Sequence, residues 1–97
     1  MSVTFYINRS ITPKKCSYMD GDPECNFANS NAAWLLEALN QDTTELVGHI
    51  NAEDMEQFIC NLKHFSYTAE RYMLRRAVEL LHVCSVAKAH NCGIYWA

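Results

Sequence analysis

A chain of 97 residues, of which 49% are hydrophobic and 20% charged, has the composition of a globular protein that can fold around one core without metals or disulfides. Its formal charge of −3 excludes an overall positive field that would attract nucleic acid, and its eleven acids are too few for a strong polyanion mimic. No apolar run reaches the length of about 20 residues that a bilayer requires, and the first residues lack the features of a secretory signal. We therefore expect one cytoplasmic domain, residues 1–97, that has no membrane partner.

Five cysteines, at positions 16, 25, 60, 84 and 92, are expected to be reduced. Their number is odd, no secretory signal precedes them, and no Cys-x-x-Cys pair occurs, so the sequence indicates neither a disulfide framework nor a zinc knuckle. Cys84 falls in the middle of an apolar helical pattern, where a thiol behaves as a small hydrophobic side chain. We expect no cofactor and no bound metal.

The N-terminal segment predicts two strands separated by a long loop. Residues 3–8 alternate strictly, with Val3 and Phe5 on one face, and their β-branched and aromatic side chains favour a half-buried strand. Residues 9–23 have neither a helical nor a strand period and predict a loop of a length that is often functional. Residues 25–28 are short and apolar enough to form a second strand.

Two amphipathic helices are expected next. In residues 30–40 the apolar side chains share one face: Ala32, Leu35, Leu36 and Leu39. Three successive N-cap candidates stand at its start, before Ala32: Asn29, Ser30 and Asn31. Residues 52–64 follow Asn51, the best cap candidate in the chain, and repeat an i, i+3, i+4, i+7 pattern with Met55, Phe58, Ile59 and Leu62. Between the helices, residues 46–50 could form a brief strand.

The longest predicted helix covers residues 67–91, with Ser66 as a candidate cap and Asn91 or Gly93 as the residue that ends it. A narrow stripe along it is apolar: Met73, Ala77, Leu80, Cys84 and Ala87. Further apolar side chains widen this stripe on one side: Leu74, Val78 and Leu81. A helix that is apolar over so wide an arc is expected to be covered by more than one neighbour. Residues 94–97 then predict a terminal strand.

The order of these elements favours a small two-layer α+β domain. We expect a sheet of two to four strands in which strand 3–8 pairs with strand 94–97. Three helices, at about 30–40, 52–64 and 67–91, are expected to cover one face of that sheet.

Local catalytic motifs are scarce. The three glycines cannot form a phosphate-binding loop, and Gly-x-Ser-x-Gly and His-Glu-x-x-His are both absent. Cys60 and His64 stand four residues apart on one predicted helix, opposite its apolar stripe, where they could act as nucleophile and base or as half of a zinc site. No third residue nearby is placed to orient the histidine, as a catalytic triad requires.

Charge is distributed unevenly along the chain. Residues 37–56 contain six acids and no lysine or arginine, whereas residues 63–76 contain four basic residues and one acid. Arg71 and Arg75 stand one turn apart on the polar side of the longest helix, where like charges repel by roughly 0.2–0.5 kcal/mol. Either the acidic segment folds back and neutralises the basic one, or both are simply solvated, or the basic side chains bind a partner.

The basic residues are interleaved with aromatic ones. Arg71 and Arg75, together with Tyr67 and Tyr72, are candidates for binding an acidic or polar partner surface, because arginine and tyrosine are common interface anchors. Nucleic acid is a disfavoured partner, since four cations in an acidic domain release few counterions. Tyr95 in the terminal strand is a further candidate, on a sheet face that the helices leave open.

These features favour a non-catalytic protein-binding or regulatory module, of the kind found among inhibitors, immunity proteins, viral accessory proteins and subunits of complexes. Its partner would be another protein or a second copy of this chain. One alternative is a thiol-dependent enzyme or redox sensor that uses Cys60 and His64. The other is a small zinc-stabilised domain.

Overall fold

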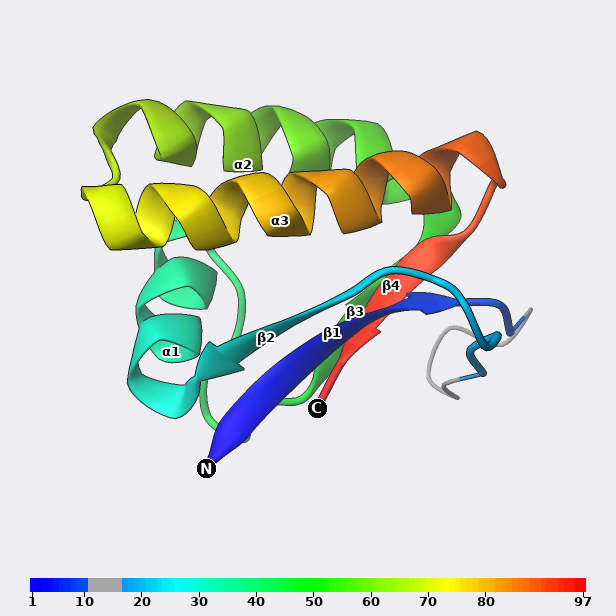
Figure 1. Cartoon of the computed structure of the whole chain (residues 1–97), viewed down its shortest axis with the longest axis horizontal. Helices are drawn as coiled ribbons and strands as arrows, with labels where there is room; N and C mark the ends of the chain where they lie inside the picture. Colours follow the sequence, from blue (N-terminus) through cyan, green and yellow to red (C-terminus); the bar gives the residue numbers. More distant parts are fainter. Residues whose placement is uncertain (11–16) are drawn as a thin grey trace.

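The computed structural model describes residues 1–10 and 17–97, which form a four-stranded antiparallel sheet and three α-helices (Figure 1). The strands are β1 (Ser2–Asn8), β2 (Glu24–Ala28), β3 (Gly48–Ile50) and β4 (Gly93–Trp96). The helices are α1 (Asn29–Ala38), α2 (Met55–Thr68) and α3 (Arg71–Ala89), and a 3-10 turn, η1 (Ala52–Asp54), precedes α2. This is the two-layer α+β architecture that the sequence predicts.

β1 lies inside the sheet, whose strand order is β2-β1-β4-β3. It pairs with β2 on one side and with β4 on the other, which confirms the expected pairing of the two terminal strands. In this register Phe5 stands opposite Trp96, and Ile7 stands opposite Ile94. The short strands expected near residues 25 and 50 are present as β2 and β3.

The sheet has one buried and one open face. Phe5, Ile94 and Trp96 point into a single core shared with all three helices. Figure 1 shows α2 and α3 running side by side across that face, with α1 near one end of the sheet. Side chains alternate along a strand, so Tyr6 and Tyr95 point the other way, where both remain partly exposed. The helices therefore cover one face, and the sheet's central tyrosines lie on the other.

α3 begins at Arg71 rather than at residue 67, because the preceding helix continues past the expected break. Ser66 lies inside α2, and its hydroxyl donates to the carbonyl oxygen of Lys63, 2.6 Å away, instead of capping α3. The helices separate at Ala69 and Glu70, whose backbone is extended, with ψ angles of 144° and 160°. Ala69, between the two helices, is partly buried against the core.

At the other expected N-caps no side chain makes a capping bond, although Asn51 does occupy the N-cap position of η1. β2 runs directly into α1, so the cap position falls on Ala28, and no side chain caps the helix. Asn51 precedes η1 without a capping bond from its side chain, since its carbonyl oxygen instead accepts from the amide of Asp54 at 3.0 Å. Its Oδ1 atom is buried and has no hydrogen-bond partner among the residues described.

The narrow apolar stripe of α3 is confirmed, since all its members are buried: Met73, Ala77, Leu80, Cys84 and Ala87. The expected widening of that stripe is wrong for Leu74 and Val78, which are 39% and 54% exposed. The narrow stripe of α3 packs on the sheet, and one flank of the helix packs on α2. Its outward side therefore has no neighbour in the part of the chain that the structure describes. None of the helices described is both long and apolar enough to cross a membrane.

Asn91, and not Gly93, adopts the left-handed conformation that ends α3, with a φ of 56°. The amide of Cys92 donates to the carbonyl oxygen of Ala87 at 2.8 Å and the amide of Asn91 to that of Lys88 at 3.0 Å, which is a Schellman motif. Gly93 serves a different purpose at the start of β4. A Cβ atom at this position would collide with the carbonyl oxygen of Ile50 in the neighbouring strand.

Gly93→Ala is expected to lower the free energy of unfolding by about 3 kcal/mol, because the added methyl group would overlap the Ile50 carbonyl oxygen and force β3 and β4 apart. Urea unfolding measures the loss. Gly21→Ala is the control: Gly21 has a φ of +90° but no atom within 4 Å of an added Cβ, so it should lose only about 1 kcal/mol from backbone strain. A smaller loss at Gly93 than at Gly21 would contradict this close packing.

Candidate functional site

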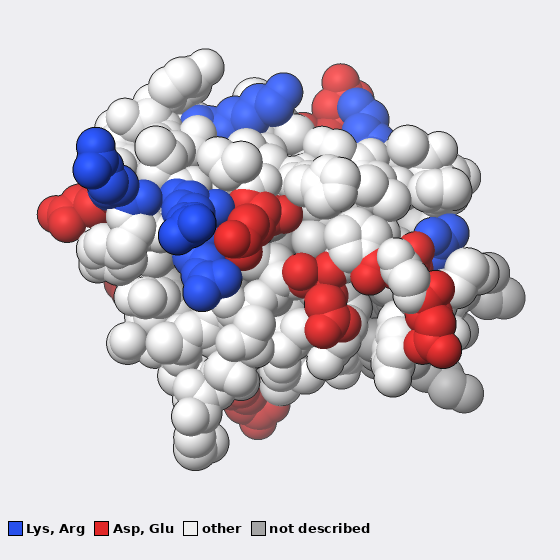
Figure 2. Space-filling model, in the orientation of Figure 1, with Lys and Arg blue, Asp and Glu red and all other residues white. Residues whose placement is uncertain are grey.

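Four of the five residues predicted to bind a partner lie together where α2 is followed by α3. Only two residues separate the helices, so Tyr67 near the end of α2 is close in the chain to Arg71, Tyr72 and Arg75 at the start of α3. Tyr67 is 85% exposed and Tyr72 54%, and both arginines are exposed too. On the face drawn in Figure 2, Lys and Arg side chains gather over this end of α3 and acidic side chains lie beside them.

A surface hollow of about 640 Å³ is lined by four residues of α3, which we call the basic cluster: Arg71, Tyr72, Arg75 and Arg76. Arg76 is the member that the sequence analysis did not select, although it belongs to the same run of cations. Its Nη1 atom donates to Oε2 of Glu79 at 3.0 Å, in a pair whose side chains are 48% and 44% exposed. Arg76 is thus partly engaged within the protein.

Arg71 and Arg75 have neither an ion pair nor a side-chain hydrogen bond with any residue that the structure describes. The ion pairs in residues 1–10 and 17–97 are Arg9–Asp22 and Arg76–Glu79. The acids of residues 37–56 therefore do not fold back onto the basic cluster, which was one of the explanations for the uneven charge. The other two explanations for the uneven charge are solvation of both segments and binding of a partner to the basic side chains.

The start of α3 is electrostatically unfavourable. Arg71 is its first residue, and the N-terminal end of a helix carries a partial positive charge. No acidic residue lies in the first turn, and Glu70 at the cap position forms no capping bond through its side chain. Repulsion between Arg71 and Arg75 adds to this cost. An acidic group bound here would relieve both effects.

Tyr95, the fifth predicted residue, lies away from the basic cluster. It belongs to the open face of the sheet, where its register partners are Tyr6 on β1 and His49 on β3. Tyr6 in turn stacks on Tyr18, with ring centroids 5.5 Å apart and an angle of 23° between the rings. The open face is thus a second surface, separated from the basic cluster by the core.

Cys60 and His64 are both exposed on α2, as the helical spacing predicts. No hydrogen bond joins them, and no third side chain in the described residues orients the histidine. His64 instead helps to line a shallow hollow of about 360 Å³ between α2 and the end of α1. In the described part of the chain, no three His, Cys, Asp or Glu side chains lie close enough to share a metal ion.

Two other cysteines are structural. Cys84 is fully buried, and burial raises the pKa of its thiol to about 12. Burial likewise raises the pKa of Cys25 to about 12, with a further contribution from the nearby carboxylate of Glu79. The thiol of Cys25 donates weakly to the Arg76 carbonyl oxygen at 3.8 Å and to the Glu79 carboxylate at 3.7 Å. Both thiols therefore stay protonated at neutral pH.

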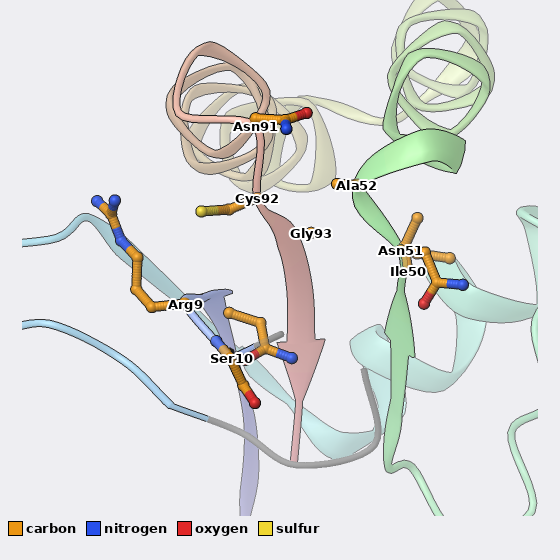
Figure 3. A pocket seen from close by; sticks show the side chains of 9 residues that line it. Arg9, Ser10, Ile50, Asn51, Ala52, Asn91, Cys92 and Gly93 are labelled. Carbon is orange, nitrogen blue, oxygen red and sulfur yellow. Dashed lines mark hydrogen bonds between the residues drawn. The ribbon is translucent and has the colours of Figure 1, made fainter. Parts of the chain in front are cut away.

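A third hollow, of about 260 Å³, lies where three strands end or begin, and Figure 3 shows Arg9 and Cys92 on one side of it and Asn51 on the other. The Arg9 guanidinium donates to both carboxylate oxygens of Asp22, at 2.9 and 2.7 Å, and these bonds lower the pKa of that carboxyl. The hollow is lined by residues from three distant segments, so no sequence motif marks it. Nothing in its geometry defines a reaction.

Thiol labelling should separate these cysteines. At pH 8 we expect Cys60 to react with iodoacetamide at the rate of a cysteine in an unstructured peptide, and Cys25 and Cys84 to react only after unfolding, because burial excludes the reagent and keeps them protonated. Peptide mapping by mass spectrometry measures each rate. A faster reaction of Cys60 that is lost in His64→Ala would instead support the thiol enzyme or sensor.

Arg71→Glu is expected to raise the free energy of unfolding by about 0.5–1 kcal/mol, because glutamate suits the positive end of a helix and can pair with Arg75 one turn later. Thermal unfolding at low and high salt measures the gain, which should shrink as salt screens it. Lys88→Glu in the last turn of α3 is the matched control, and the same charge change there should destabilise. A loss of stability in Arg71→Glu would contradict the electrostatic account.

Comparison of the chain with protein-family models, with curated proteins and with solved structures finds no match.

Proposed function

We propose that this protein is a non-catalytic binding module that captures an acidic surface of a protein partner through α3. The observation that carries the proposal is the state of Arg71 and Arg75. Both are exposed on one helix and have no partner among the described residues, in a chain whose net charge is −3. Tyr72 lines the same hollow, and Tyr67 lies in the last turn of the preceding helix; both supply exposed, rigid aromatic surface of the kind that anchors interfaces.

A protein fits this surface better than nucleic acid does. Lys63 and the three arginines of the basic cluster are few cations for a polyanion, and the domain as a whole repels one. The open sheet face carries tyrosines, but its outward strand residues include the acid Glu24 and no lysine or arginine. An inhibitor, an immunity or accessory protein, or a subunit of a complex would each act through such a surface. The four cysteines that the structure describes in this chain are free thiols, as expected of a protein in the reducing cytoplasm.

The double variant Arg71→Glu/Arg75→Glu tests the proposal. Affinity capture from native cells with the wild-type protein identifies a candidate partner, and calorimetry with the purified partner then gives the Kd. We expect the double variant to bind at least about 30-fold more weakly, which is the loss typical of a central arginine anchor. Circular dichroism should show an unchanged fold.

Lys88→Glu is the control for charge alone, since Lys88 is an exposed cation on the same helix, about 20 Å further along its axis than Arg75. It should bind the partner within about twofold of the wild-type protein. Undiminished binding by the double variant would remove the basic cluster from consideration, and an equal loss in Lys88→Glu would show that only net charge matters.

A further inference from the structure

The outward side of α3 is both basic and apolar. Arg71, Leu74, Arg75 and Val78 follow each other at i, i+3, i+4 and i+7, so they share one face of the helix. We call these residues the outward stripe. Leu74 and Val78 are two of the large hydrophobic side chains that the fold leaves exposed, at 39% and 54%. Leu74 lies between the two unpaired arginines and Val78 follows them, and packing of the core does not require either side chain to be apolar.

The C-terminal part of α2 extends this surface. The Phe58 ring stacks on Trp96, and the Phe65 ring meets Trp34 edge-on, so this flank of α2 points away from α3, toward β4 and α1. Tyr67 lies about half a turn around α2 from Phe58 and Phe65, so its side chain points away from that flank and into solvent. With 85% of its surface exposed, Tyr67 is available to a molecule that lies along the outward stripe.

We propose that the occupant of the outward stripe is an acidic amphipathic helix of the partner, a conclusion that rests on the proposed function and specifies its ligand. Apolar side chains of the incoming helix pack on Leu74 and Val78, and carboxylates one turn away pair with Arg71 and Arg75. This is the helix-on-helix mode of recognition, in which anchors recur at i, i+3, i+4 and i+7.

The backbone chemistry favours a helix over an extended segment. The peptide groups of α2 and α3 are bonded within their own helices, so they offer no donors or acceptors to a neighbouring strand. An extended segment buried against Leu74 and Val78 would therefore leave its own amide and carbonyl groups unpaired, at a cost of roughly 1–3 kcal/mol each. A helix satisfies these groups internally and brings only side chains to the contact.

The charges favour an acidic helix. A helix lying on Leu74 and Val78 also excludes water from Arg71 and Arg75, and a cation that loses water without gaining a partner is strongly destabilising. Carboxylates restore the lost interactions and relieve the repulsion within the stripe. A second copy of this chain is less suitable, because its own outward stripe is basic and would repel this one in a symmetric dimer, so the contact would have to be heterologous.

A displayed library of 18-residue helices, randomised along one face, is the probe for this proposal. Selection against the full-length protein should enrich peptides with Leu, Ile or Phe four residues apart and Asp or Glu one turn away. Synthetic peptides from the enriched clones should bind with micromolar Kd in fluorescence anisotropy. Val78→Ser should weaken binding at least tenfold, whereas Val47→Ser, at a valine that is 49% exposed on another surface, should leave it unchanged.

The second part of the experiment exchanges the charges of the protein and the peptide. Arg71→Glu/Arg75→Glu should lose the acidic peptides at least tenfold and bind versions in which lysine replaces their acids. If peptides depend on the arginines but not on Leu74 and Val78, the helix proposal is overturned and the proposed function stands. If they depend on Val78 but on neither arginine, both fail. Failure to enrich acidic helices, or self-association abolished by Val78→Asp, would overturn the helix proposal alone.

Discussion

Phe5 lies at the centre of the interaction on which the rest of the structure depends, the pairing of β1 with β4. It stands opposite Trp96, its ring 5.5 Å from the indole and 5.4 Å from Phe27, and it is fully buried. This pairing joins the two ends of the chain inside one sheet, so α3 must cross the sheet to deliver β4. Its narrow apolar stripe then rests on the strands, and the outward stripe necessarily points to solvent. The candidate site is thus a geometric consequence of the strand pairing.

Patterns with a strong period were readable from the sequence. The alternation in β1 and the stripe from Met73 to Ala87 each reflect burial of one face, which selects apolar side chains at every second, or every third and fourth, position. The predictions that were wrong concern features that depend on which other segments pack against a helix. No local signal marks the break at Ala69 and Glu70, where Ala69 packs on the core, and none shows that α3 leaves Leu74 and Val78 uncovered.

The candidate site, too, could be predicted from the sequence only in part. Charge spacing selected Arg71 and Arg75, and the structure adds that no described carboxylate reaches them. The sequence predicts Tyr95 on a sheet face that the helices leave open, and the strand register places it there beside Tyr6, away from the basic cluster. The hollow between Arg9, Asn51 and Cys92 could not have been predicted, because strand pairing alone brings these segments together.

The start of α3 violates two local rules at once, since it places cations at the positive end of a helix and leaves apolar side chains in water. A single substitution could correct each feature without disturbing the core. Glutamate at position 71 would suit the positive end of the helix, and serine at position 78 would replace an exposed apolar side chain. Sequences that break local rules without compensation inside the fold commonly do so at functional sites. A bound acidic helix compensates both features together: its carboxylates meet the arginines and its apolar side chains cover Leu74 and Val78. A purely acidic loop would correct the charge and leave the apolar side chains exposed, and a purely apolar helix would do the reverse.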